Sequence, residues 1–217
     1  MISHSRAVQI TLPEAETLAD LYGIEYDLDT AIQLCHKALS LSKEAPDDYQ
    51  LVEAVITAAV VRYFRCLNTG VRLGIQSSDL EQLNEEDRGT HNYLKDLRDK
   101  FVVHSVNPFE NSYVTTTATE KDGELLPITS LNPGNHRLVL SSSDARMLLD
   151  VARKVRTINE AKVAEEKERL LRIVQARPLE EIHGGDLYTP EPMLVTEVGK
   201  SRRTKSRSNN SLQARRP

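Results

Sequence analysis

The residues best suited to chemistry border one apolar seam of a predicted helix. Leu94, Leu97 and Phe101 form the seam. At about 100° per residue, Arg98 lies about 40° to one side of Leu94 and His104 about 80° to the other. His104 also falls in the last predicted turn, where the helix dipole favours the charged imidazole. Such a histidine is suited to donating a proton or holding a phosphate.

Three potential cations line one edge of the same helix. His91, Lys95 and Arg98 fall at positions i, i+4 and i+7, a pattern that suits an anionic ligand. The six histidines of the chain never pair at the i,i+3 or i,i+4 spacing of a helical metal site. Glycine-rich phosphate loops, a nucleophile elbow and a His-Glu-x-x-His motif are absent from the sequence. We therefore predict no metal and no cofactor.

The stretch from Arg98 to His104 resembles the signature of the HEPN superfamily. That signature has an arginine, a polar residue directly after it, a short apolar stretch and a histidine near the end of a bundle helix, with four to six residues between arginine and histidine. Here five residues intervene, and Asp99 occupies the polar position. The resemblance covers roughly residues 26–175, apart from a β-hairpin insertion, and uncharacterised bacterial and phage proteins have similar helix ends.

The resemblance implies a metal-independent ribonuclease that acts as a homodimer, with two copies of the motif facing each other. RNA supplies its own 2′-hydroxyl nucleophile, so the enzyme needs a proton-transfer group and a cation for the phosphorane charge. His104 would take the first role and Arg98 the second. Asp99 would orient His104 of the partner or Arg98 of its own chain. In a straight helix Arg98 and His104 diverge by about 120° and lie about 9 Å apart, so one phosphate requires both copies.

Both motif residues also have structural alternatives. His104 is equally suited to a position at the edge of the core, where a carbonyl satisfies its ring. Arg98 is equally suited to a salt bridge with Asp96, with Asp99 or with a carboxylate of the long helix that follows.

Charge is distributed unevenly along the 217 residues. The chain has 28 Lys+Arg and 32 Asp+Glu, a net charge of −4. Residues 200–217 hold seven basic and no acidic side chains, so the rest of the chain carries −11 (−4 minus 7). An acidic body argues against coating nucleic acid through a folded surface. The tail is predicted to be disordered, as a solubilising terminus or as a nucleic-acid-binding arm.

Cysteine content and hydropathy predict a cytoplasmic protein. Only two cysteines occur, which excludes a disulfide framework. No secretion signal is visible at the N-terminus, and the longest apolar run is far below the roughly 20 residues of a membrane span.

Helical periodicity dominates the chain up to the motif. The first helix is predicted to be capped by Asp27 or Asp29 and to end before Pro46. The second is predicted over residues 47–68, and the third over residues 78–105 with a weak point near a glycine, Gly89.

The second predicted helix is apolar around most of its circumference. We therefore expect it at the centre of a bundle, covered by the other helices. Arg62 and Arg65 on this helix favour an ion pair at the core edge over a second phosphate contact, and Cys66 favours core packing.

A β-hairpin insertion is predicted at about residues 112–141. Its first strand is Tyr113–Thr117, its turn is Asp122-Gly123, a further turn is Asn132–Gly134, and its closing strand is Arg137–Leu140.

A long helix is predicted over residues 143–176, capped by Ser143 or Asp144. Its first half carries apolar residues at core spacing. Its second half has Glu165/Arg169 and Glu168/Arg172 at the i,i+4 spacing of a solvated helix. At about 1.5 Å per residue the helix is roughly 50 Å long, so we expect its end to project or to meet a partner.

Together these patterns predict an all-α, HEPN-like helical bundle with a small β-hairpin insertion. We expect an N-terminal segment (1–25), the bundle (26–176) and a linker with the basic tail (177–217). We expect first a ribonuclease or RNA-binding protein of defence or toxin type, which acts as a homodimer and does not associate with a membrane. The alternatives are a non-catalytic scaffold or adaptor that binds a protein through helix 143–176, and a small-nucleotide sensor that uses the edge of His91, Lys95 and Arg98.

Overall fold

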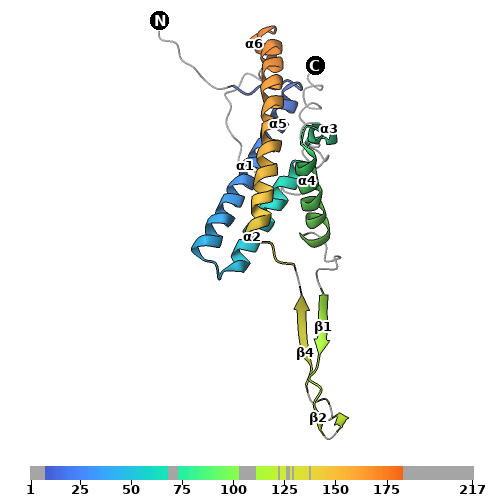
Figure 1. Ribbon diagram of the computed structural model, residues 1–217. Coiled ribbons are helices and arrows are strands. Elements are labelled where there is room, and N and C mark those ends of the chain that lie inside the picture. The colour runs from blue at the N-terminus through green and yellow to red at the C-terminus, as the bar shows by residue number, and fades with distance from the viewer. Residues whose placement is uncertain are drawn as a thin grey trace, which may run out of the picture. The chain divides into compact units, whose positions relative to one another are not determined.

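The computed structural model describes residues 8–67, 73–102, 111–121, 123–125, 128, 130–136 and 138–182. The chain is mostly helical, with a small two-stranded antiparallel ribbon between α4 (Glu85–Leu97) and α5 (Ser142–Gln175) (Figure 1). The predicted combination of helices with a β-hairpin is therefore confirmed. The predictions for His104 and for the basic tail fall outside the described residues and stay predictions.

The chain divides into two compact units. The first unit comprises residues 1–27, 65–82 and 155–217, and the second comprises residues 28–64 and 83–154. The candidate site residues that the structure describes belong to the second unit.

Helix α1 spans Ala15–Glu44, so the predicted start at Asp27 or Asp29 is wrong. Ile24 is already fully buried, one turn before the expected cap. Asp27 is buried as well, and its carboxylate forms an ion pair with Nε of Arg65 at 3.4 Å. An aspartate inside a helix is tolerated when a cation compensates its charge, and such an aspartate looks like a cap in the sequence.

In the first unit, the second half of α5 is covered by other segments of its own chain. Val163 and Leu170 are buried there, so this half is not solvated all round, and its length alone does not require a partner. Arg169 pairs with Glu166 at 2.6 Å rather than with the predicted Glu165. Polar contacts hold the surrounding segments in place. From α5, Asn159 Nδ2 donates to the Leu21 carbonyl at 3.2 Å, and Lys162 Nζ donates at 2.7 Å to Asp79 of the short helix α3 (Ser77–Leu80). After the end of α5, Arg177 donates to Glu14 at 2.8 Å.

Helix α5 begins at Ser142, one residue before the predicted start, but the predicted cap at Ser143 or Asp144 is wrong because both residues lie inside the helix and Ser141 precedes it. The backbone N–H and hydroxyl of Ser141 donate to the Asp144 carboxylate at 2.8 and 2.9 Å, the reciprocal half of a capping box. The first half of the helix then buries Leu148 and Val151 in the core, as the apolar spacing predicts.

The predicted third helix is divided in two, at a different place from the one expected. The break lies between α3 and α4, where the Asn84 side chain accepts from the N–H of Asp87 at 2.8 Å and caps α4. Gly89 lies inside α4 without interrupting it. A π-helical segment, η1 (Arg98–Val102), continues directly from α4.

The hairpin has the predicted turn but a different closing strand. Gly123 joins β2 (Glu120–Lys121) to β3 (Glu124–Leu125) with φ of 85°, in the left-handed region that favours glycine. Strand β1 (Asn111–Thr115) pairs with β4 (Asn132–His136), so the predicted turn over Asn132–Gly134 and the closing strand Arg137–Leu140 are wrong.

A cross-strand contact explains the register of β1 and β4. Gly134 lies opposite Tyr113, and a Cβ at this glycine would come within 2.5 Å of the tyrosine ring. The ring therefore covers the glycine. Pro133 fits because a two-stranded ribbon has outer edges where no N–H is needed.

Helix α2 spans Tyr49–Arg65, and the Asp48 carboxylate accepts from the N–H of Leu51 at its start. One face is buried, but Leu51 and Val61 on the opposite face are 44% and 40% exposed. The expectation that other helices cover α2 on all sides is therefore wrong for this face within the described part of the chain.

Candidate functional site

Arg98 lies where α4 passes into η1, and its guanidinium is held from two sides. Nη2 forms an ion pair with Oδ1 of Asp99 at 2.5 Å, and the guanidinium carbon lies 5.2 Å from the ring centroid of Phe64. The Arg98 side chain is 24% exposed, so it is oriented by the protein but accessible in part to solvent. The ion pair with Asp99 is one of the structural alternatives that the sequence offered.

The backbone of the motif is unusual. Residues from Arg98 to Val102 form a π-helical turn rather than the straight helix assumed in the sequence analysis. Nε of Arg98 is buried and has no hydrogen-bond partner among the residues described. An unsatisfied buried donor and a π turn are both unfavourable, and both features concentrate at functional sites. The segment from Arg98 to Val102 therefore differs from an ordinary helix in its backbone and in the unsatisfied donor of Arg98.

His91 does not share an exposed edge with Lys95 and Arg98. His91 is 8% exposed, and a hydrogen bond of 2.9 Å joins its Nδ1 to the Tyr63 hydroxyl. The ring also lies against Phe64, with centroids 5.6 Å apart. Burial and the nearby charge of Lys95 lower the pKa of His91, which favours the neutral form. His91 is therefore not available as an accessible cation. The predicted edge of His91, Lys95 and Arg98, on which the nucleotide-sensor alternative depends, keeps only Lys95 and Arg98.

The burial of neutral His91 predicts a lower free energy of unfolding in mild acid. The folded pKa of His91 lies below the unfolded value of about 6.5, so the unfolded chain binds a proton that the folded chain does not. The free energy of unfolding should fall as pH drops below that value, until the folded pKa is passed. Urea denaturation at pH 7.5 and 5.5 measures the loss. His91→Gln, which keeps a polar partner for Tyr63, should shrink it, and an equal loss in both proteins would contradict this assignment.

Two further candidates, Arg65 at the end of α2 and Cys66 directly after it, have structural roles. Arg65 forms the ion pair with buried Asp27, as the core-edge interpretation predicts. Cys66 is fully buried, and its thiol donates to the Ile24 carbonyl at 3.6 Å. Both predictions are confirmed.

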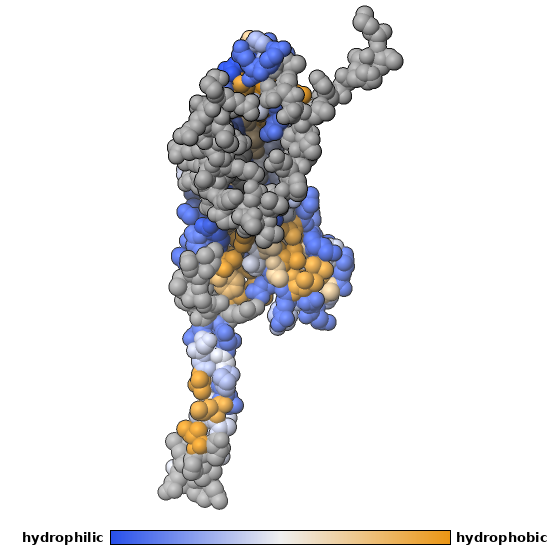
Figure 2. All heavy atoms as spheres, turned by 180° about the vertical axis from the view of Figure 1, so that it is seen from behind, coloured by the Kyte–Doolittle hydropathy of each residue, from blue (hydrophilic) through white to orange (hydrophobic). Residues whose placement is uncertain are grey.

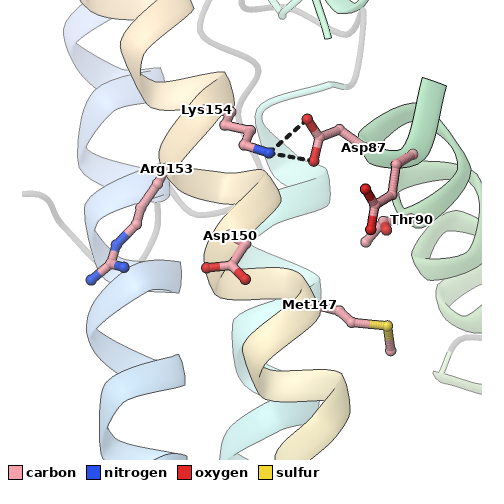
Figure 3. Close-up of a pocket in the computed structure, with 7 residues that line it drawn as sticks. Asp87, Thr90, Met147, Asp150, Arg153 and Lys154 are labelled. Atoms are coloured by element: carbon pink, nitrogen blue, oxygen red, sulfur yellow. Dashed lines mark hydrogen bonds and ion pairs between the residues drawn. The ribbon is translucent and has the colours of Figure 1, made fainter. Parts of the chain in front are cut away.

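A pocket that the sequence analysis missed lies in the second unit, between side chains of α4 and α5 (Figure 3). Its volume is about 320 Å³. Lys154 crosses it to donate to both carboxylate oxygens of Asp87, at 2.6 and 2.7 Å, and this hydrogen bond raises the pKa of Lys154. No sequence motif marks the pocket. The side chains that line it are Glu86, Asp87, Thr90, Met147, Asp150, Arg153 and Lys154.

The pocket does not resemble a reaction centre. Lys154 is paired with Asp87, and Arg153 forms a hydrogen bond of 3.0 Å with Nε2 of His36. The lining combines one hydroxyl, that of Thr90, with the carboxylates of Glu86, Asp87 and Asp150, and it contains neither a histidine nor a cysteine. The arrangement is best explained as a polar link between the two helices.

In the described ranges, no group of three His, Cys, Asp or Glu side chains is placed to hold a metal ion. None of the described helices is long and apolar enough to cross a membrane. Comparison with protein-family models, with curated proteins and with solved structures finds no match for this chain.

Proposed function

We propose that this chain is a metal-independent ribonuclease that acts as a homodimer, with Arg98 and His104 in the roles that the HEPN resemblance implies. The observation that supports this best is the π turn that starts on Arg98. Turns of this type are rare, and they appear frequently at functional sites. The π turn contains two of the predicted site residues, Arg98 and Asp99.

The surroundings of Arg98 suit phosphate binding. A guanidinium already held by Asp99 and Phe64 loses less side-chain entropy when it binds a phosphoryl oxygen. Its planar fork matches the equatorial oxygens of a phosphorane. Asp99 acts as a positioning residue for Arg98, and His104 moves protons to and from the 2′-hydroxyl and the leaving oxygen.

A direct assay tests this proposal on the unmodified protein. The chain is expected to cut single-stranded RNA in excess EDTA and to leave 2′,3′-cyclic phosphate or 3′-phosphate ends, because the 2′-hydroxyl is the nucleophile. Mass spectrometry of the fragments identifies these ends. RNA carrying 2′-O-methyl groups throughout is the matched control and should stay intact. Ends with a free 3′-hydroxyl, or no cleavage of any RNA, would refute the ribonuclease proposal.

A second candidate function is a non-catalytic interaction protein, and the hairpin favours it. Val114, Ile128 and Leu131 are 64%, 63% and 69% exposed, and every residue of β1 is exposed. Hydrophobic atoms are visible along the ribbon in Figure 2. An isolated two-stranded ribbon is marginally stable in water, so apolar side chains on it suit a protein partner. A chain that dimerises but cuts no RNA would fit this candidate.

A further inference from the structure

Most of the apolar seam of the motif helix is already used within its own chain. Leu94 is fully buried and Leu97 is 6% exposed, and only Phe101, which is half-buried, is left in part accessible. The HEPN resemblance implies two copies of the motif facing each other, which would place this seam at the dimer contact. A homodimer therefore needs another apolar surface, which must be exposed on the single chain.

Helix α2 has such a surface. Leu51, Ala54, Ala58 and Val61 are all exposed, with Leu51 and Val61 at 44% and 40%. Their spacing of three, four and three residues is the a/d spacing of a coiled-coil seam, so the four side chains lie on one stripe. Figure 2 shows hydrophobic atoms gathered over helices on the face opposite to that of Figure 1.

The two ends of this stripe carry opposite charges. One a/d step before Leu51 is Asp47, which is exposed, and one step after Val61 is Arg65, whose side chain is 55% exposed. Arg65 already pairs with Asp27, but a guanidinium has five donors and can bind two carboxylates. The stripe thus runs from an acid through an apolar middle to a base.

We propose that α2 pairs with α2 of a second copy of this chain, antiparallel and in one register centred at Ile56. In that register Leu51 packs against Val61 of the other copy, and Ala54 packs against Ala58. Asp47 meets Arg65 at both ends. A parallel pair would instead place Asp47 against Asp47 and Arg65 against Arg65, so charge complementarity selects the antiparallel arrangement.

The flanks of the stripe agree with the same register. Asp48 and Arg62 lie at equivalent flanking positions of the heptad. Antiparallel pairing therefore brings Asp48 of one copy toward Arg62 of the other. The two alanines in the middle let the helix backbones approach closely. Val55 is half-buried on the single chain and lies near the two-fold axis, where it meets its own copy.

This inference goes beyond the proposed function. Phe64, against which Arg98 lies, is eight residues from the centre of the register, so its two copies are about 24 Å apart along α2 and the pair does not bring two motifs to one phosphate. The inference rests on the exposed stripe and its charges, not on RNA cleavage. Its own readouts are association and cross-linking, which need no RNA. A dimer built on α2 by a chain that cuts no RNA would retain this inference and remove the ribonuclease. RNA cleavage by a dimer that does not involve α2 would do the reverse.

The first test places a charge in the centre of the stripe. Ala58→Glu should weaken dimerisation by at least about a hundredfold, because the carboxylate would be buried against Ala54 of the partner without a cation. Ala164→Glu makes the same substitution at an exposed position of α5 and should leave dimerisation unchanged. Sedimentation from 1 to 100 µM measures both. A monomeric wild type, or equal association of the two variants, would overturn the proposal.

The second test fixes the register. Leu51→Cys and Val61→Cys proteins, mixed and oxidised, should form a disulfide-linked heterodimer. Neither variant alone should cross-link, because identical positions lie about 15 Å apart in this register. The natural Cys35 and Cys66 are buried, and burial raises the pKa of the Cys35 thiol to about 12, so neither competes. Cross-linking of Leu51→Cys with itself would point to a parallel pair and refute the register.

Discussion

Arg98→Ala is expected to lower RNA cleavage by about 10²–10³-fold, the usual cost of removing one donor that stabilises transition-state charge. His104→Ala should have an effect of similar size through lost proton transfer. The fold should survive Arg98→Ala, because the side chain is 24% exposed and loses one ion pair and one contact with the Phe64 ring. Single-turnover cleavage, thermal melting and sedimentation on the same samples measure activity, stability and dimerisation separately.

Two further variants show whether the effect belongs to the arginine itself. Lys100→Ala removes an exposed cation of the same turn, whose side chain is 59% exposed, and should leave cleavage within about twofold. Arg98→Lys keeps the charge but loses the donor fork, so its activity should lie between wild type and Arg98→Ala. If Arg98→Ala cuts RNA normally but melts far below wild type, Arg98 is a structural residue and the interaction-protein candidate is favoured.

Leu148→Ala is expected to lower the free energy of unfolding by about 2–5 kcal/mol. Leu148 is fully buried on the first half of α5, so truncation removes apolar burial and leaves a cavity. Leu171 on the same helix is 54% exposed, and Leu171→Ala should change the free energy of unfolding by less than about 0.5 kcal/mol. Both substitutions replace leucine with alanine within one helix, so helix propensity affects them equally.

Urea denaturation at pH 7.5 measures both variants against the wild type. Equal losses of unfolding free energy for Leu148→Ala and Leu171→Ala would mean that Leu148 is no more buried than Leu171. A large loss for Leu171→Ala alone would indicate that this exposed leucine is covered in solution by a partner.

Elements governed by local chemistry could be predicted from the sequence. The start of α5 could be predicted to within one residue, because Asp144 marks the first turn, where its carboxylate accepts from the N–H of Ser141 three residues earlier. The turn of the hairpin follows from Gly123, which adopts a positive φ without steric cost. Cys66 could be assigned to the core because of its apolar helical surroundings.

Elements that depend on contacts distant in sequence could not be predicted. Asp27 signals a helix start on its own, and its pairing with Arg65 helps to compensate its charge inside α1. Residues 132–134 signal a turn, but they pair with β1 as a strand, and the Tyr113 ring covers Gly134. In each case a partner outside the local window reverses the local preference.

The same division applies to the candidate site. The sequence by itself determined that Arg98 and Asp99 are neighbours able to pair, and that α2 is apolar around most of its circumference, since both follow from residue order and helical periodicity. Only the tertiary structure decided that His91 is buried against Tyr63, that the motif starts a π turn, and that the stripe of α2 with Leu51 and Val61 is exposed. Periodicity fixes which residues share a face of a helix, but packing against the rest of the chain decides which face is covered.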